Sequence, residues 1–215
     1  MQSRSALSLI SAVLAASLIS AVPAHAGGRV TLDTGHVDVI DIEYENGALE
    51  VHVHDETVEP DVTREPGEVL FRALPESRTT VPDGPAYAFL GRPGAPLWVL
   101  PEVENPGLLW PGISTEELSS GVFAADSVTL KLRNVRGPGR FSIFTEGAAG
   151  TPDVLVNSGD GLPDATALSV GGHKHASWAF SAPGTYWLTF QVTAQLTGGT
   201  QRVASEPVTY LFKVG

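Results

Sequence analysis

Apolar and polar residues alternate along two neighbouring stretches of the chain, His36–Tyr44 and Ala48–Asp55. A hydrophobic period of two predicts strands that bury one face. The dipeptide Asn46-Gly47 between them suits a two-residue type I′ turn. The pattern therefore predicts a β-hairpin near the start of the chain.

Short runs rich in β-branched and aromatic residues predict further strands, and Gly- or Pro-containing turns separate them. The predicted strands are Val69–Ala73, Tyr87–Leu90, Leu97–Leu100, Ser127–Arg133, Arg140–Thr145, Ser177–Ser181, Thr185–Ala194 and Pro207–Val214. Only Ser114–Leu118 has a helical signature, with Ser114 as N-cap and Glu117 at the capping-box position. The proline-rich stretch 93–111 also carries Trp and Leu residues, which favours a packed irregular segment.

This pattern predicts an all-β protein, an immunoglobulin-like β-sandwich with an N-terminal β-hairpin and irregular Pro/Gly-rich connections. The stretch from Phe180 to Val192 supports it, because a strand, a tight turn and a second strand with Tyr186 near its start are typical of sandwich modules. We expect residues 27–215 to form a single β-sandwich domain, with a candidate sub-division near residue 122.

The first 26 residues are typical of a signal peptide. Arg4 precedes an apolar, serine-containing stretch, and Ala24-His25-Ala26 has the small-x-small form of a cleavage site. We expect cleavage after Ala26 and a mature chain that is secreted, extracellular or cell-surface associated. No later stretch is long and apolar enough to span a membrane, and the chain ends without a wall-sorting tail.

Composition narrows the chemistry that the chain can offer. It carries 24 acidic and 13 basic residues, a net charge of -11, and its lysines are far apart in sequence, which argues against nucleic acid or another polyanion as partner. It has no cysteine, which excludes disulfides, thiolate nucleophiles and Cys-type zinc fingers. Any metal site must therefore use imidazole and carboxylate ligands.

The five histidines of the expected mature chain fall in three motifs, His36-Val-Asp38, His52-Val-His54 and His173-Lys-His175. Residues i and i+2 of a strand share a face, so two imidazoles at that spacing can converge on one ion. Zinc accepts three or four such ligands. The candidate metal ligands are His36, His52, His54, His173 and His175; solvated strand and loop histidines are the alternative.

Hairpin register divides these candidates. With a two-residue turn, Glu45 pairs with Ala48 and Asp41 with His52, so His36 and Asp38 would face away from His52 and His54. A three-residue loop or a bulge would restore a common face, but it would spoil the match of Ile40 and Ile42 with Val51 and Val53 across the sheet. The simplest register therefore favours His52 and His54, together with the distant His173 and His175, over His36.

Enzyme signatures are weak. His52-x-His54-x4-Glu59 matches half of a cupin pattern, and no glycine frame surrounds a nucleophilic serine. We therefore expect no enzymatic activity. Among the aromatic residues, Trp178 follows His175 by three positions, and we expect it to form a wall over the metal site.

Six segments together resemble the actinobacterial surface-anchored protein domain, also called the choice-of-anchor M domain. The likeness extends over nearly all of residues 30–215, and the segments that carry it are Thr34–Val39, Leu49–Glu56, Ala88–Gly91, Leu97–Pro101, Gly137–Gly139 and His173–Tyr186. The resemblance implies an exported β-rich protein associated with metal ABC transporters and with zinc or manganese acquisition. It also implies that all five candidate histidines lie in recurrent motifs of the family.

These observations predict a secreted accessory protein that binds a divalent metal and scavenges it or hands it to an ABC-type importer. The expected metal is Zn(II), with Mn(II) or Cu(II) as alternatives, and the expected protein partner is the substrate-binding protein of a metal ABC transporter. The alternative is a non-catalytic cell-surface adhesion or cell-wall interaction module whose histidines are structural.

Overall fold

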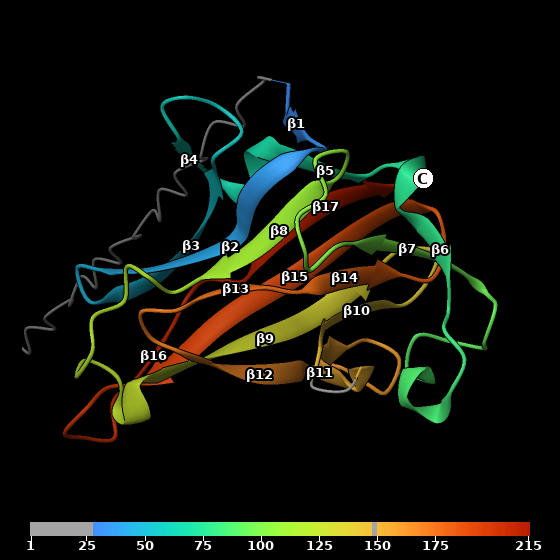
Figure 1. The fold of residues 1–215 in the computed structure, drawn as a ribbon. Helices are drawn as coiled ribbons and strands as arrows, with labels where there is room; N and C mark the ends of the chain where they lie inside the picture. The colour runs from blue at the N-terminus through green and yellow to red at the C-terminus, as the bar shows by residue number, and fades with distance from the viewer. Residues whose placement is uncertain (1–27, 148–149) are drawn as a thin grey trace, which may run out of the picture.

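The computed structural model describes residues 28–147 and 150–215, so the predicted signal peptide lies outside the described residues (Figure 1). The strands are β1 (Val30–Leu32), β2 (Gly35–Glu45), β3 (Ala48–Asp55), β4 (Val62–Arg64), β5 (Val69–Ala73), β6 (Arg78–Thr80), β7 (Pro96–Leu100), β8 (Leu109–Ser114), β9 (Ser127–Arg136), β10 (Phe141–Glu146), β11 (Pro152–Asn157), β12 (Asp164–Ser169), β13 (His173–His175), β14 (Ser177–Phe180), β15 (Gly184–Gln195), β16 (Arg202–Ala204) and β17 (Val208–Val214). Within the described ranges, four short 3-10 helices interrupt the strands: η1 (Pro66–Glu68), η2 (Pro75–Ser77), η3 (Pro85–Tyr87) and η4 (Ala124–Asp126).

The strands form three sheets. A seven-stranded sheet has the order β1-β5-β17-β15-β9-β12, with β16 on β15. One five-stranded sheet has the order β11-β10-β14-β7-β6, and a second, which we call the histidine sheet, has the order β13-β8-β2-β3-β4. Figure 1 shows β2, β3 and β8 lying over the long strands of the seven-stranded sheet. The predicted all-β sandwich is confirmed.

The core lies between the inner faces of these sheets. Trp178 of β14 packs against Phe190 of β15 and Phe212 of β17, with ring centroids 6.3 and 5.8 Å apart. Ile40 and Val53 of the histidine sheet are fully buried in the same apolar cluster. One continuous core therefore connects the three sheets, which is what a single domain requires.

The tyrosine expected near the start of a sandwich strand has a structural role. Tyr186 is fully buried, and its hydroxyl donates to the carbonyl of Ala182, 2.8 Å away. The connection that it fixes leads from β14 in one sheet to β15 in the other. A tyrosine bonded back to the chain just upstream is a feature of immunoglobulin-type sandwiches.

Two local predictions are wrong. Tyr87–Leu90, predicted as a strand, begins at the end of η3 and continues as a turn, in which the Leu90 amide donates to the Tyr87 carbonyl. Pro85 two residues earlier starts that helical turn, which overrides the β-propensity of the aromatic residues. Ser114 is the last residue of β8 rather than the cap of a helix; its hydroxyl accepts from the Glu116 amide at the start of a single turn.

The hairpin pairs as expected at its turn and departs from the simplest register further along. Glu45 lies opposite Ala48 and Asp41 opposite His52, but Asp38 lies opposite His54. β2 therefore has one more residue than β3 between these two pairs, a β-bulge at residues 39 and 40. Both bulged residues are fully buried, and β8 supplies the apolar partner, Ile113, for Ile40.

The described residues contain no helix that is long and apolar enough to cross a membrane.

Candidate metal centre

Four adjacent strands of the histidine sheet align the candidate residues in two rows. One row runs from His54 through Asp38 and Gly112 to His175. The next runs from His52 through Asp41 and Ser114 to His173. Directly opposed residues of neighbouring strands share a face, so the bulge in β2 places all of these side chains, and His36 two residues before Asp38, on one face of the sheet.

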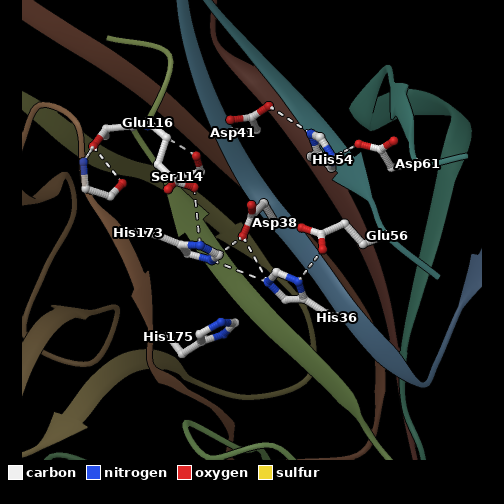
Figure 2. Close-up of polar contacts among 12 residues, drawn as sticks. His36, Asp38, Asp41, His54, Glu56, Asp61, Ser114, Glu116, His173 and His175 are labelled. Atoms are coloured by element: carbon white, nitrogen blue, oxygen red, sulfur yellow. Dashed lines mark hydrogen bonds and ion pairs between the residues drawn. The ribbon is translucent and has the colours of Figure 1, made fainter. Parts of the chain in front are cut away.

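Three of the five predicted ligands converge. His36 of β2 meets His173 and His175 of β13, and each offers a ring nitrogen within 4.8 Å of the others (Figure 2). We call His36, His173 and His175 the three-histidine cluster. The register argument that disfavoured His36 is overturned by the bulge, and His36 is the residue that connects β2 to the β13 pair.

Asp38 adds a carboxylate to the cluster. Its Oδ1 lies 2.8 Å from Nε2 of His173 and 3.5 Å from Nε2 of His36, and the two Nε2 atoms are 3.3 Å apart. Ligand atoms held 2.0–2.1 Å from a tetrahedral zinc ion are about 3.3 Å from one another. The three separations therefore match three corners of one zinc coordination sphere, with the Asp38–His173 edge shorter than ideal.

The Asp38 oxygen is buried without a hydrogen-bond partner. The side chain of Asp38 is only 6% exposed, and no donor among the described residues is aligned with Oδ1 despite its closeness to His173. An unpaired buried carboxylate oxygen is costly, and a cation beside it removes that cost. This oxygen points to the same space as the two Nε2 atoms.

Each imidazole of the cluster is held through its other ring nitrogen. Nδ1 of His36 lies 3.0 Å from Glu56, Nδ1 of His173 lies 3.4 Å from Glu116, and Nδ1 of His175 lies 3.1 Å from the Pro111 carbonyl. An oxygen acceptor at Nδ1 favours the Nδ1–H tautomer, which leaves a lone pair on Nε2. Oxygen partners of this kind orient histidines in metal sites.

Gly112 makes room for this arrangement. A Cβ built on Gly112 would overlap Asp38 Oδ1 and would lie 2.9 Å from Nε2 of His173. Asp38 and His173 lie diagonally across β8 from each other, so they meet only because the strand between them has no side chain at this point. Glycine here serves close approach rather than an unusual backbone angle.

An aromatic wall also borders the cluster. The indole of Trp110 stacks on His175 with ring centroids 3.7 Å apart and an angle of 9° between the planes, and it lies 5.1 Å from His36. The expectation that Trp178 forms this wall is wrong, because Trp178 is fully buried in the core. An odd spacing of three from His175 points a strand residue to the opposite face.

The cluster contains histidines of different basicity. The nearby Asp38 carboxylate raises the pKa of His36 above 6.5; burial opposes this and Glu56 reinforces it. Burial lowers the pKa of His175, although its bond to the Pro111 carbonyl partly compensates. His175 is therefore neutral and ready to bind a metal at neutral pH, whereas on His36 a metal ion competes with a proton.

His52 and His54, which we call the hairpin histidines, do not join the cluster. Nε2 of His54 lies 2.7 Å from Asp61, and Nε2 of His52 lies 3.4 Å from Glu50. Among the described residues, neither belongs to a group of three potential ligands within 4.8 Å of one another. Their ring nitrogens lie close to carboxylates, two of which, Asp61 and Glu65, lie on the segment that follows β3.

Comparison of the chain with protein-family models, with curated proteins and with solved structures finds no match.

Sequence reasoning proposed the three clustered histidines but missed most of what surrounds them. Glu116, Trp110 and Gly112 were not identified, because β8 was not predicted as a strand; Glu56, which reaches His36 across the predicted hairpin, was not identified either. Its sequence, Leu-Trp-Pro-Gly-Ile-Ser, contains Pro111 between β2 and β13, and proline is normally confined to sheet edges. Gly112 was the one signal in the sequence for this arrangement, because a glycine within an apolar run marks a place where another group approaches the backbone closely.

Proposed function

We propose that the protein binds one divalent transition-metal ion, Zn(II), through His36, His173, His175 and Asp38. The observation that carries this proposal is the arrangement of nitrogens in the three-histidine cluster. An oxygen atom lies near Nδ1 of each ring, and Nε2 of His36 and Nε2 of His173 face each other 3.3 Å apart. Two ring nitrogens at that distance share either a proton or a metal ion, and the Asp38 carboxylate beside them favours a cation.

The donor set favours zinc among the candidate ions. Three neutral imidazoles and one carboxylate suit a tetrahedral Zn(II) site, and Cu(II) binds similar ligands with more planar geometry. Mn(II) prefers more oxygen ligands and six-fold coordination. Neighbouring Glu56 and Glu116 add negative charge that attracts a cation to this face.

The biological role is an extension of this binding. We infer that the protein scavenges zinc outside the cell and hands it to the substrate-binding protein of an ABC-type importer. Support comes from the signal-peptide pattern and the resemblance to the choice-of-anchor M domain. The cluster histidines are 19% and 27% exposed at His36 and His173, so an acceptor protein can reach the bound ion.

A calorimetric zinc titration of the chelator-treated protein tests the site. We expect one ion per chain and a Kd of micromolar or tighter. The variant His173→Ala/His175→Ala should weaken binding by about 100-fold or more, because two of four ligands are lost. The matched variant His52→Ala/His54→Ala should stay within about threefold of the wild type.

Two results would overturn the proposal. One is an absence of binding by the wild-type protein at micromolar zinc. The other is a loss of affinity in the hairpin-histidine variant equal to that in the cluster variant, which would place the ion elsewhere. Circular dichroism melting of all three proteins ensures that the comparison is made between folded chains.

A further inference from the structure

The charged residues of the protein are divided between the sheets. β2 and β3 carry six acidic residues and no lysine or arginine: Asp38, Asp41, Glu43, Glu45, Glu50 and Asp55. The strands of the seven-stranded sheet carry one acidic residue, Asp164, and six basic ones: Arg72, Lys131, Arg133, Arg136, Arg202 and Lys213. A chain with a net charge of -11 therefore presents a cationic sheet.

These basic residues point away from the core. Along β9 the residues Val128, Leu130 and Leu132 are buried, so Lys131 and Arg133 alternate to the outer face. Arg202 lies opposite Gln195 at the edge, and Lys213 lies on the neighbouring strand β17. Lys131 and Lys213, which are far apart in sequence, therefore lie on the same face of one sheet.

The neutral residues of this outer face are hydrogen-bonding groups. On β15, Thr189, Gln191, Thr193 and Gln195 alternate with the buried apolar residues. The series begins at Trp187, whose side chain is 44% exposed and whose ring lies 5.9 Å from the guanidinium of Arg136. From Trp187 to Gln195 the strand advances eight residues, about 26 Å.

One end of this strip is hollowed. A surface cavity of about 440 Å³ lies over β9, β15 and β16, lined by Lys131, Arg202, Thr129, Thr193 and Gln195 together with small apolar residues. No carboxylate lines the cavity, and no described carboxylate forms an ion pair with Lys131 or Arg202. Two unneutralised cations beside hydroxyl and amide groups form a site for an anionic, hydroxyl-rich ligand.

We propose that the outer face of the seven-stranded sheet binds an anionic glycan, a polysaccharide that carries carboxylate or phosphate groups, with the Lys131/Arg202 cavity as its charged subsite. The hydroxyls of Thr129 and Thr193, which form no side-chain hydrogen bond among the described residues, would bond sugar hydroxyls in the cavity, whereas the Gln191 and Gln195 amides already bond protein groups. The net charge of the chain argued against a polyanion as partner. Net charge sums over the whole molecule, however, and so hides the cationic outer face of this one sheet.

Spacing of charge favours a glycan over a nucleic acid. Duplex DNA carries one charge per about 1.7 Å, and the acidic remainder of this protein would repel such a density. The five cations of the strip, Lys131, Arg133, Arg136, Arg202 and Lys213, are instead spread over several strands among neutral polar residues. A polymer with about one charge per sugar fits that distribution.

Binding assays with defined polymers test the proposal. Full-length mature protein is titrated with polygalacturonate as the carboxylate probe, phosphomannan as the phosphate probe, dextran as the neutral control and poly(dT) as a dense polyanion. We expect binding to at least one anionic polysaccharide, weakened by salt, and no binding to dextran. Lys131→Gln/Arg202→Gln should reduce affinity at least about tenfold, the effect of losing two charge-assisted contacts.

The control removes two charges elsewhere. Arg78→Gln/Arg92→Gln changes exposed arginines outside the seven-stranded sheet and should leave affinity unchanged. Chelator-treated protein should bind as well as zinc-loaded protein, which separates this site from the metal centre. The proposal is overturned if neither anionic polysaccharide binds, if the two double variants lose affinity equally, or if poly(dT) binds as tightly as the glycans.

Discussion

A single missing side chain decides whether the metal centre can assemble. Gly112 lies between Asp38 and His175 in the sheet, and a Cβ there would occupy the space of Asp38 Oδ1. The atom that this Cβ would displace belongs to Asp38, a proposed zinc ligand, and not to the flexible end of a surface side chain.

The substitution Gly112→Ala should therefore weaken zinc binding by about 100-fold or more, because it displaces Asp38 and crowds His173. Calorimetric titration measures the loss. Gly67→Ala is the matched control, since a Cβ at Gly67 meets no atom within 4 Å. Wild-type affinity in Gly112→Ala would show that Asp38 does not belong to the site.

Protonation of one residue sets the pH dependence of zinc binding. The pKa of His36 is raised above 6.5 by Asp38, so in the metal-free protein a proton occupies this ligand at a higher pH than in an isolated histidine. Zinc affinity should fall by at least about tenfold as the pH drops from 7.5 to 5.5. Titrations at several pH values measure this change, and a constant affinity to pH 5.5 would point to carboxylate ligands alone.

At the scale of elements, the β-bulge of β2 determines which histidines meet. The hairpin turn, the pairing of Asp41 with His52 and most strands were predictable, because a period of two and an Asn-Gly turn are local signals. The bulge was not predictable, because it depends on β8, which gives Ile40 its apolar neighbour in Ile113. Because β8 was not predicted as a strand, the sequence favoured His52 over His36 as a metal ligand.

The remaining errors have the same origin. Strand β8, which lies in the middle of the histidine sheet, contains Pro111 and Gly112, and these residues argued against predicting it as a strand. Glu116 is distant in sequence from His173, and only the pairing of β8 with β13 brings the two together, whereas Glu56 reaches His36 across the β2–β3 hairpin. The local sequence pattern thus predicted histidines as ligands, but the pairing of strands far apart in sequence determines which histidines converge.

The segment that follows β3 is fixed by a buried ion pair. The Asp55 side chain is fully buried and accepts from Arg64 at 2.8 Å and from the Thr57 hydroxyl. Burial alone would raise the pKa of Asp55, but these hydrogen bonds hold it below its usual range. The same segment carries Glu56, which orients His36.

Arg64→Met should lower the free energy of unfolding by about 3 kcal/mol at neutral pH, because it leaves a buried carboxylate without its partner. Since the folded pKa of Asp55 is depressed, its stabilising contribution is present above about pH 4 and disappears as the pH falls through the folded value. Denaturant unfolding at pH 7 and pH 3 measures both. An equal difference between wild type and variant at the two pH values would contradict the assignment.

Across the whole molecule, the two outer faces carry opposite charge. Strands β2 and β3 of the histidine sheet combine imidazoles with carboxylates, while the strands of the seven-stranded sheet carry six basic residues and one acidic residue. This division allows one domain to attract a metal ion on one face and an anionic polymer on the other. The overall charge of -11 describes neither face.

Zinc should stabilise the whole domain, because the cluster ties β2 to β13 at opposite sides of β8. Zinc in 100-fold excess over Kd contributes about 2.7 kcal/mol, equivalent to a rise in Tm of about 5–10 °C for a domain of this size. Thermal melting with zinc and with chelator measures the shift. His173→Ala/His175→Ala should show no shift, and an equal shift in that variant would mean that the stabilising ion binds elsewhere.

The most direct measurement of the central claim is an anomalous difference map from a zinc-soaked crystal, recorded at the zinc absorption edge. We expect one peak about 2.0–2.2 Å from Nε2 of His36, His173 and His175 and from an oxygen of Asp38. A peak at the hairpin histidines instead, or no ordered peak in the three-histidine cluster, would contradict it.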